Sequence, residues 1–209
     1  MAMPDPLAII GKVPVIPVLT IETLEQAVPL ARALQAGGLP VIEVTLRTKA
    51  APDAIRAIAS EFPQCVVGAG TVTQPADIDV AVAAGAKYLV SPGTPPDLAA
   101  ALAQARIPVI PGCATVSEAM ALAARGFNVL KFFPAESAGG AGWLKSVAAP
   151  LPGLRFCPTG GIGADNAAKY LALPNVVAVG GSWVAPQDAI AARDFDRITQ
   201  LARAAAALR

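Results

Sequence analysis

The sequence contains no histidine among its 209 residues. This absence excludes Ser–His and Cys–His nucleophilic pairs, and it also excludes a zinc or iron ion held by imidazole. Any catalysis must therefore use lysine, carboxylates, arginine, tyrosine, cysteine, hydroxyl groups or backbone amides. We expect neither a metal site nor a cofactor.

Charged residues are few and balanced in sign, since they make up 15% of the chain and leave a net charge of +1. Such a chain has no basic field for nucleic acid or for an anionic membrane, so any phosphate contact must be local. The longest uncharged stretch, residues 170–187, is interrupted by proline and glycine and does not suit a membrane-spanning helix. The first five residues lack the basic region of a signal peptide, which predicts a cytoplasmic protein.

Cysteine is also scarce. Cys65, Cys113 and Cys157 are scattered through apolar surroundings and form no C-x-x-C pair. Their odd number and wide spacing argue against a disulfide framework or a zinc site. We interpret all three as small core residues.

Hydrophobic residues are abundant, at 55% of the chain, and short apolar runs alternate with longer Ala-rich amphipathic segments. This alternation is typical of repeated βα units around a parallel sheet. Several of the predicted helices close on glycine, as at Gly37, Gly85 and Gly126. The eight strand-like runs are VPVIPVLTI from Val13, VIEVTLR from Val41, CVVGAGTV from Cys65, KYLVSPG from Lys87, IPVIPGCAT from Ile107, NVLKFFPA from Asn128, LRFCPTGGI from Leu154 and VVAVGGSW from Val176.

Eight such units that fill the chain predict an α/β fold, a (β/α)₈ TIM barrel in a single domain over residues 1–209. Residues 1 to about 12 are expected to form a short segment that caps the lower end of the barrel. The alternative architecture is an open doubly wound sheet. The sequence lacks the G-x-G-x-x-G motif with a distal acidic residue that would favour it.

Charged side chains inside strands are informative, because a barrel interior is normally apolar and active sites lie at the carboxyl ends of the strands. Apart from two strand starts, the charged residues of the eight runs are Glu43, Arg47 and Lys131. The two-residue period of a strand places Glu43, Thr45 and Arg47 on one face. A structural ion pair would explain these charges without any chemistry, but buried pairs are poor stabilisers. We therefore interpret them as catalytic.

Lys131 is flanked by leucine and phenylalanine, with Phe133 beside it. Apolar neighbours disfavour the ammonium form and so favour the free amine, which can attack a ketone. The resulting iminium withdraws electrons from the adjacent carbon, and Glu43 can move the protons needed for C–C cleavage, directly or through a water. Arg47 can bind the carboxylate of the substrate. The pattern predicts a Schiff-base aldolase that acts on a 2-keto acid.

Glycine pairs follow the last two strand-like runs, as Gly160-Gly161 after Thr159 and as Gly180-Gly181 before Ser182. Backbone amides at this place in a barrel commonly bind phosphate. A tight turn would explain either pair alone, but their joint position favours a phosphate site.

Two further residues at strand ends, Thr71 and Pro92, complete a ring that could line the pocket. Turn chemistry explains each of them at least as well when it is considered alone.

Six segments carry a family resemblance, and they span nearly the whole chain. KFFPAE and FCPTGGI are specific motifs, whereas GAGT alone would not be. Together they resemble the family of 2-keto-3-deoxy-6-phosphogluconate (KDPG) and 4-hydroxy-2-oxoglutarate (KHG) aldolases. The segments are EVTLR from Glu43, GAGTV from Gly68, Pro111-Gly112, KFFPAE from Lys131, FCPTGGI from Phe156 and VGGSW from Val179.

The resemblance implies a cofactor-free class I aldolase, generally a homotrimer, that reversibly cleaves KDPG to pyruvate and D-glyceraldehyde 3-phosphate and also acts on KHG. It implies that Lys131 forms the Schiff base and that Glu43 transfers protons. The residues implied at the pyruvate end are Arg47, Thr71 and Phe133, and those implied at the distal polar and phosphate end are Thr159, Gly160, Gly161 and Ser182.

Three alternatives remain open at this point. The related aldolases of phosphogalactonate usually carry a motif closer to PVGGV, so Thr159 favours the gluconate epimer. A phosphate-binding barrel isomerase or synthase would share the glycine pairs but would not need Lys131. A catalytically silent sugar-phosphate binding protein would need neither Lys131 nor Glu43. One departure from the family pattern is Thr20, which stands where an arginine is expected.

Overall fold

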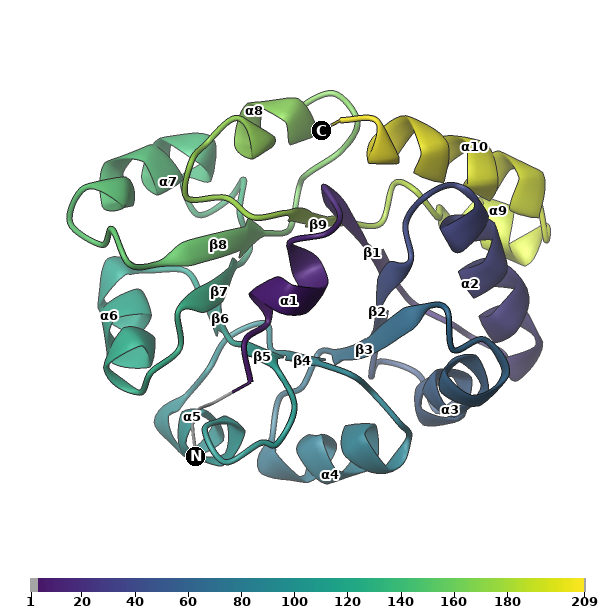
Figure 1. Cartoon of the computed structure of the whole chain (residues 1–209), viewed down its shortest axis with the longest axis horizontal. Coiled ribbons are helices and arrows are strands. Elements are labelled where there is room, and N and C mark those ends of the chain that lie inside the picture. The colour runs from purple at the N-terminus through teal and green to yellow at the C-terminus, as the bar shows by residue number, and fades with distance from the viewer. Residues whose placement is uncertain (1–3, 209) are drawn as a thin grey trace.

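The computed structural model describes residues 4–208, and in it the eight predicted runs form a ring of parallel strands surrounded by helices (Figure 1). One ladder has the order β5-β4-β3-β2-β1-β9 and the other has the order β6-β7-β8. Bridges between Phe156 and Val176 and between Thr159 and Gly180 join the two ladders on one side. The strands are β1 Val15–Leu19, β2 Val41–Thr45, β3 Val66–Gly70, β4 Leu89–Val90, β5 Val109–Ile110, β6 Gly112–Cys113, β7 Val129–Phe132, β8 Arg155–Pro158 and β9 Val179–Gly181.

The fifth predicted run forms two short strands instead of one. Pro111 separates β5 from β6, because proline has no N–H group with which to continue a ladder. The Pro111 carbonyl still accepts a hydrogen bond from the Lys131 amide at 2.9 Å, so this segment stays in the ring. The last strand is also shorter than expected, since β9 begins at Val179 rather than at Val176. The predicted barrel is confirmed, with these two local differences.

A helix follows each of the eight runs on the outside of the ring. The predicted glycine ends are confirmed: Gly37 caps α2, while Gly85 and Gly126 follow α4 and α6 with positive φ angles of 92° and 94°. The helices are α1 Leu7–Ile10, the 3-10 helix η1 Leu24–Gln26, α2 Ala27–Ala36, α3 Ala51–Glu61, α4 Pro75–Ala83, α5 Pro96–Leu102, α6 Val116–Ala124, α7 Gly140–Ala148, α8 Ala167–Leu171, α9 Gln187–Ala191 and α10 Phe195–Ala206.

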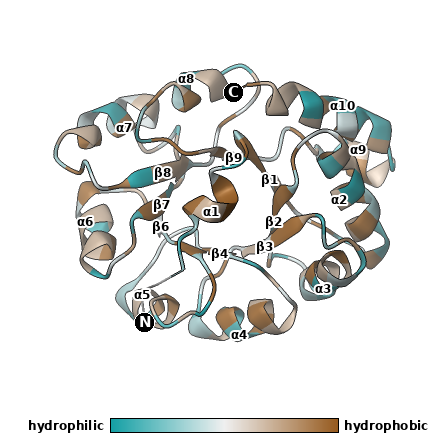
Figure 2. Ribbon diagram, viewed as in Figure 1, coloured by the Kyte–Doolittle hydropathy of each residue, from teal (hydrophilic) through white to brown (hydrophobic). Residues whose placement is uncertain are grey.

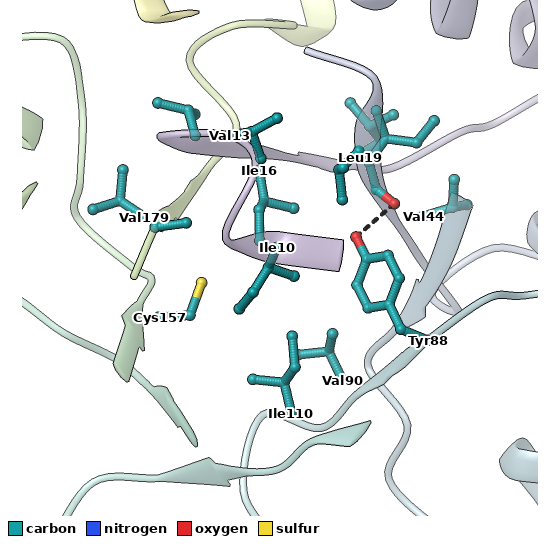
Figure 3. Packing of buried hydrophobic residues seen from close by; sticks show 14 of the residues in the cluster. Ile10, Val13, Ile16, Leu19, Val44, Tyr88, Val90, Ile110, Cys157 and Val179 are labelled. Carbon is teal, nitrogen blue, oxygen red and sulfur yellow. Dashed lines mark hydrogen bonds between the residues drawn. The ribbon is translucent and has the colours of Figure 1, made fainter. Parts of the chain in front are cut away.

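The inside of the barrel is filled by apolar side chains from α1 and from most of the strands. Figure 2 shows hydrophobic residues along the inner strands and polar residues on the outer surfaces of helices such as α10. Ile10 of α1 is fully buried among side chains such as Ile16, Cys157 and Val179 (Figure 3). Helix α1 immediately precedes β1 and lies across the ring in Figure 1, at the end where the strands begin. Residues 1–3 of the predicted capping segment lie outside the described residues, and the single-domain assignment stays a prediction.

Tyr88 adds one polar group to this interior. Its ring is fully buried, and its hydroxyl donates a hydrogen bond of 2.7 Å to the Ile42 carbonyl. Burial raises the pKa of Tyr88 well above its ordinary value, so the phenol stays neutral and serves as a structural donor.

The three cysteines are buried and free, as predicted. Burial raises the pKa of each thiol to about 12, which keeps all three protonated at neutral pH and removes them as nucleophiles. None of the helices within residues 4–208 is long and apolar enough to cross a membrane.

Candidate active site

A cavity of about 460 Å³ opens at the carboxyl ends of the strands, which is where barrels carry their active sites. Its walls come from the segments that follow β1, β2, β7, β8 and β9. The predicted site residues that line it are Arg47, Phe133, Thr159, Gly160, Gly161 and Ser182.

Lys131 and Glu43 form a buried ion pair close to this cavity. Lys131 lies on β7 and Glu43 on β2, yet the Nζ atom of the lysine is 3.2 Å from Oε1 of the carboxylate. The two residues are 5% and 4% exposed. Neither lines the cavity, but the lysine Nζ lies 5.5 Å from the centre of the Phe133 ring, which does. The pair therefore lies next to the cavity, near Phe133, at what we call its inner end.

Gly70 makes room for the Glu43 side chain. The two residues lie on neighbouring strands, and a Cβ atom at position 70 would collide with the Glu43 carboxylate. The glycine at the end of the GAG sequence is thus required by the placement of Glu43. Thr45 shares a face with Glu43 but has a structural contact, because its Oγ1 donates a hydrogen bond of 2.9 Å to the Leu19 carbonyl.

Arg47 and Thr71 are joined at the rim of the cavity. The Nε of Arg47 donates a hydrogen bond of 3.1 Å to Oγ1 of Thr71. Thr71 has a φ of 59°, which is strained for a β-branched residue and is typical of functional sites. No carboxylate of residues 4–208 forms a salt bridge with Arg47. Its guanidinium is therefore available for an anionic ligand.

Pro92 is the predicted site residue that stands apart. It follows β4, and its carbonyl packs against Gly112 of β6, so that a Cβ atom at position 112 would collide with it. It is not among the residues that line the cavity. Its position is explained by the packing of neighbouring strand ends.

In the loop after β8, the carbonyl groups of three successive residues, Thr159, Gly160 and Gly161, all accept hydrogen bonds. Two accept a hydrogen bond from the segment after β7, and the third accepts one from a side chain five residues further along the same loop. The three bonds are Ala135 N to Thr159 O at 2.8 Å, Glu136 N to Gly160 O at 3.1 Å, and Asn166 Nδ2 to Gly161 O at 2.9 Å.

The amides that follow these carbonyls are those of Gly160, Gly161 and Ile162. A trans peptide unit is planar, so each N–H group points away from the carbonyl of the same unit. Within residues 4–208 the Gly161 and Ile162 N–H groups have no hydrogen-bond acceptor, whereas the Gly160 N–H faces Gly180 across the bridge between Thr159 and Gly180. All three residues line the cavity. The two glycines have φ angles of 100° and 74°. Two free N–H groups in succession, with backbone of this kind, form a site for an anion.

The cavity is also lined by residues that were not predicted as site residues, among them Thr20, Ile162, Trp183 and Gln187. Thr20 and Trp183 follow the ends of β1 and β9, and their position at strand ends is a signal that could have identified them. Ile162 contributes an amide, which its side chain does not reveal. Gln187 reaches the cavity from the start of α9, and its Nε2 donates a hydrogen bond of 3.0 Å to the Thr20 carbonyl, 167 residues away in sequence. No local pattern marks it.

Comparisons with known proteins agree with this geometry. Residues 7–201 match the family model "Aldolase: KDPG and KHG aldolase". The KHG/KDPG aldolase of Escherichia coli strain K12 is 52% identical over 192 residues, which cover 92% of this chain and 90% of that protein.

Two solved structures are similar over almost their whole length. The KDPG aldolase of Legionella pneumophila, with pyruvate captured at low pH as a covalent carbinolamine intermediate, is 47% identical with a TM-score of 0.95, over 97% of this chain and 98% of that one. The aldolase of Zymomonas mobilis ZM4 with 3-phosphoglycerate is 44% identical with a TM-score of 0.94, over 100% and 98% of the two chains. From its barrel, its buried lysine–glutamate pair and these similarities, the chain belongs to the KDPG and KHG aldolase family.

Proposed function

We propose that this protein is a class I aldolase that reversibly cleaves KDPG to pyruvate and D-glyceraldehyde 3-phosphate and that also acts on KHG. The observation that carries the proposal is the arrangement of the cavity. A buried lysine and carboxylate, Lys131 and Glu43, lie 3.2 Å apart at its inner end. Two free amides, those of Gly161 and Ile162, lie at its outer end. A substrate with a ketone at one end and a phosphate at the other fits this division.

Lys131 performs the covalent step. Its free amine attacks the C2 carbonyl of the substrate, and the carbinolamine loses water to give an iminium. When the C4 hydroxyl loses its proton, the C3–C4 bond breaks and its electron pair flows into the iminium. The aldehyde leaves and an enamine remains on Lys131. Protonation of the enamine at C3 and hydrolysis of the iminium then release pyruvate and restore the amine.

Glu43 moves the protons. Its contact with Lys131 Nζ at 3.2 Å allows it to take a proton from the amine before attack. The same carboxylate, directly or through a water, assists the loss of water from the carbinolamine and accepts the proton of the C4 hydroxyl. Glu43 therefore acts at several steps, and its loss slows each of them without removing the nucleophile.

The remaining residues bind the two ends of the substrate. Arg47, with Thr71 as its hydrogen-bond partner, holds the carboxylate next to the ketone. The loop of Gly160 and Gly161 holds the phosphate through the Gly161 and Ile162 amides, together with Ser182 on the neighbouring strand end.

Phe133 contacts the pyruvate end of the substrate, and Thr159 contributes to its distal polar end; both residues line the cavity. Thr159 is buried, and its hydroxyl supports the gluconate over the galactonate configuration at C4. Pro92 stays a proposed substrate-binding residue, although it does not line the cavity.

We further propose that the protein is a homotrimer. Large apolar side chains are exposed on α4, at Val80 and Val82, and on α6, at Val116 and Met120, and subunit contacts would cover side chains of this kind. A particle mass of about three times 21.1 kDa, measured by light scattering on a sizing column, would support the trimer. A mass near that of one chain would overturn it. A cytoplasmic location stays a prediction.

The function is tested by assaying the two C4 epimers side by side. The enzyme should release pyruvate from KDPG with a kcat/KM at least about tenfold above that for the phosphogalactonate epimer, since one well-placed hydrogen bond is worth about that much. A higher kcat/KM for the galactonate epimer would reassign the substrate. No pyruvate from either compound, nor from KHG, would contradict the aldolase activity itself.

A further inference from the structure

The side chain of Asn166 makes two hydrogen bonds to the backbone of the loop after β8. Of the three donors that bind the loop carbonyls, Ala135 and Glu136 use backbone N–H groups, whereas Asn166 uses its side chain. Its Nδ2 donates to the Gly161 carbonyl at 2.9 Å, and its Oδ1 accepts from the Gly163 amide at 2.9 Å. Both halves of the side-chain amide are thus engaged, which fixes its orientation.

This contact determines which way the peptide between Gly161 and Ile162 faces. With the Gly161 carbonyl turned toward Asn166, the Ile162 N–H points to the cavity. Glycine opposes rotation of this peptide weakly, because it has no Cβ atom. A rotated peptide would present its carbonyl oxygen to the bound anion and would repel it. The hydrogen bond from Asn166 therefore determines whether the Ile162 N–H, which attracts the anion, or the Gly161 carbonyl oxygen, which repels it, faces the cavity.

We infer that Asn166 is a positioning residue for recognition of the substrate phosphate, an inference that rests on the phosphate site of the proposed function. Asn166 does not line the cavity, so it acts through the Gly161–Ile162 peptide and touches no substrate atom.

Helix α8 supplies a second support for the same loop. Tyr170 of α8 is fully buried, and its hydroxyl donates a hydrogen bond to the Glu136 carboxylate. The Glu136 side chain lies directly beneath Gly161, where a Cβ atom would be 2.7 Å from the Cβ of Glu136. This contact limits how closely Gly161 can approach Glu136, whereas Asn166 determines the direction of the Gly161–Ile162 peptide.

The test compares substrates with and without phosphate. Asn166→Ala should lower kcat/KM for KDPG about tenfold, mainly through KM, which is the effect of losing one hydrogen bond to a charged group. Inorganic phosphate, used as a competitive inhibitor, should bind about tenfold more weakly for the same reason. The kcat and KM for KHG, which carries no phosphate, should stay within about twofold of the parent values.

A second variant guards against simple misfolding. Asn166→Asp keeps the shape and the acceptor for Gly163 but cannot donate to Gly161 when it is ionised, so it should lose at least as much phosphate affinity as Asn166→Ala. Ala168→Asp places the same charge at an exposed position of α8 that does not contact the loop. It should leave the affinity for inorganic phosphate within about twofold.

Three results would overturn the inference. Equal losses on KDPG and KHG would give Asn166 a general structural role. Unchanged inhibition by phosphate in both Asn166 variants would show that the peptide direction does not depend on it, while the phosphate site stood. Failure of inorganic phosphate to inhibit the parent enzyme would remove the phosphate site itself and the inference with it.

Discussion

The two ends of the cavity use different parts of the chain. The inner end consists of charged side chains on strands, and Lys131 and Glu43 are almost fully buried there. The outer end consists of backbone amides on a loop, and Gly161 is exposed. Covalent chemistry needs one particular side chain held rigidly by a hydrogen-bonded ladder. Anion binding needs only that several N–H groups point the same way. Changes at the inner end should therefore affect every substrate, and changes at the outer end should affect phosphorylated substrates alone.

The largest effect is expected at the inner end. Lys131→Ala removes the nucleophile, so cleavage of both KDPG and KHG should fall to background. The change leaves Glu43 buried without its partner, and Lys131→Met, which preserves more of the side-chain volume, serves as a second variant. Circular dichroism checks that each variant is folded. Lys145→Ala, at an exposed lysine of α7, is the control and should keep full activity. Substantial cleavage by folded Lys131→Met would contradict the assignment.

The next largest effect separates the two members of the pair. Glu43→Gln keeps the shape beside Gly70 but removes the acid–base function, so kcat should fall about 10²- to 10⁴-fold on both substrates. The lysine remains able to add slowly to pyruvate. Glu61→Gln, at an exposed position of α3, is the matched control. Full turnover by Glu43→Gln would mean that another group transfers the protons.

A charge at the outer end should discriminate between substrates. Ser182→Asp places a carboxylate beside the phosphate, and two such charges near a protein surface repel by up to about 4 kcal/mol at 4 Å. We expect kcat/KM for KDPG to fall at least about 100-fold and that for KHG to fall much less. Ser117→Asp adds the same charge on exposed α6 and should change neither. Equal losses on both substrates would place the phosphate elsewhere.

The smallest expected effects concern backbone strain. Thr71 and Arg193 both have positive φ angles, 59° and 55°, but only Thr71 lies at the site. Arg193→Gly should raise the Tm by about 2–4 °C without changing activity. Thr71→Gly should also raise the Tm, yet lower kcat/KM about tenfold on both substrates, because Arg47 loses its partner.

Thermal unfolding and steady-state kinetics of the two variants decide this prediction. A lower Tm for Thr71→Gly would mean that the hydrogen bond to Arg47 outweighs the strain.

The inner end was largely predictable from the sequence, and the outer end only in part. Lys131 and Glu43 stand out because charges are rare within barrel strands, and the two-residue period gives their faces. The glycines after β8 could be located, but not the direction of their N–H groups. That direction depends on hydrogen bonds from Ala135 and Glu136, which the fold brings to the loop from the segment after β7, and from Asn166 further along the same loop.

Two other features of the fold were not predicted. The missing amide of Pro111 divides the fifth strand, although the run is continuously apolar in sequence. Gln187 reaches the Thr20 carbonyl between the adjacent ends of β9 and β1, which only the closed ring brings together. Local patterns predict which residues lie at strand ends. They do not predict which side chains cross between those ends.

The central claim is that Lys131 forms the covalent bond, and peptide mapping after borohydride reduction tests it most directly. The parent enzyme and Glu43→Gln are incubated with pyruvate, reduced with borohydride, digested and analysed by mass spectrometry. We predict a reduced adduct on Lys131 in both proteins, accumulating more slowly in Glu43→Gln. A label on Lys87, Lys145 or any other lysine, or no label in the parent enzyme, would contradict the account.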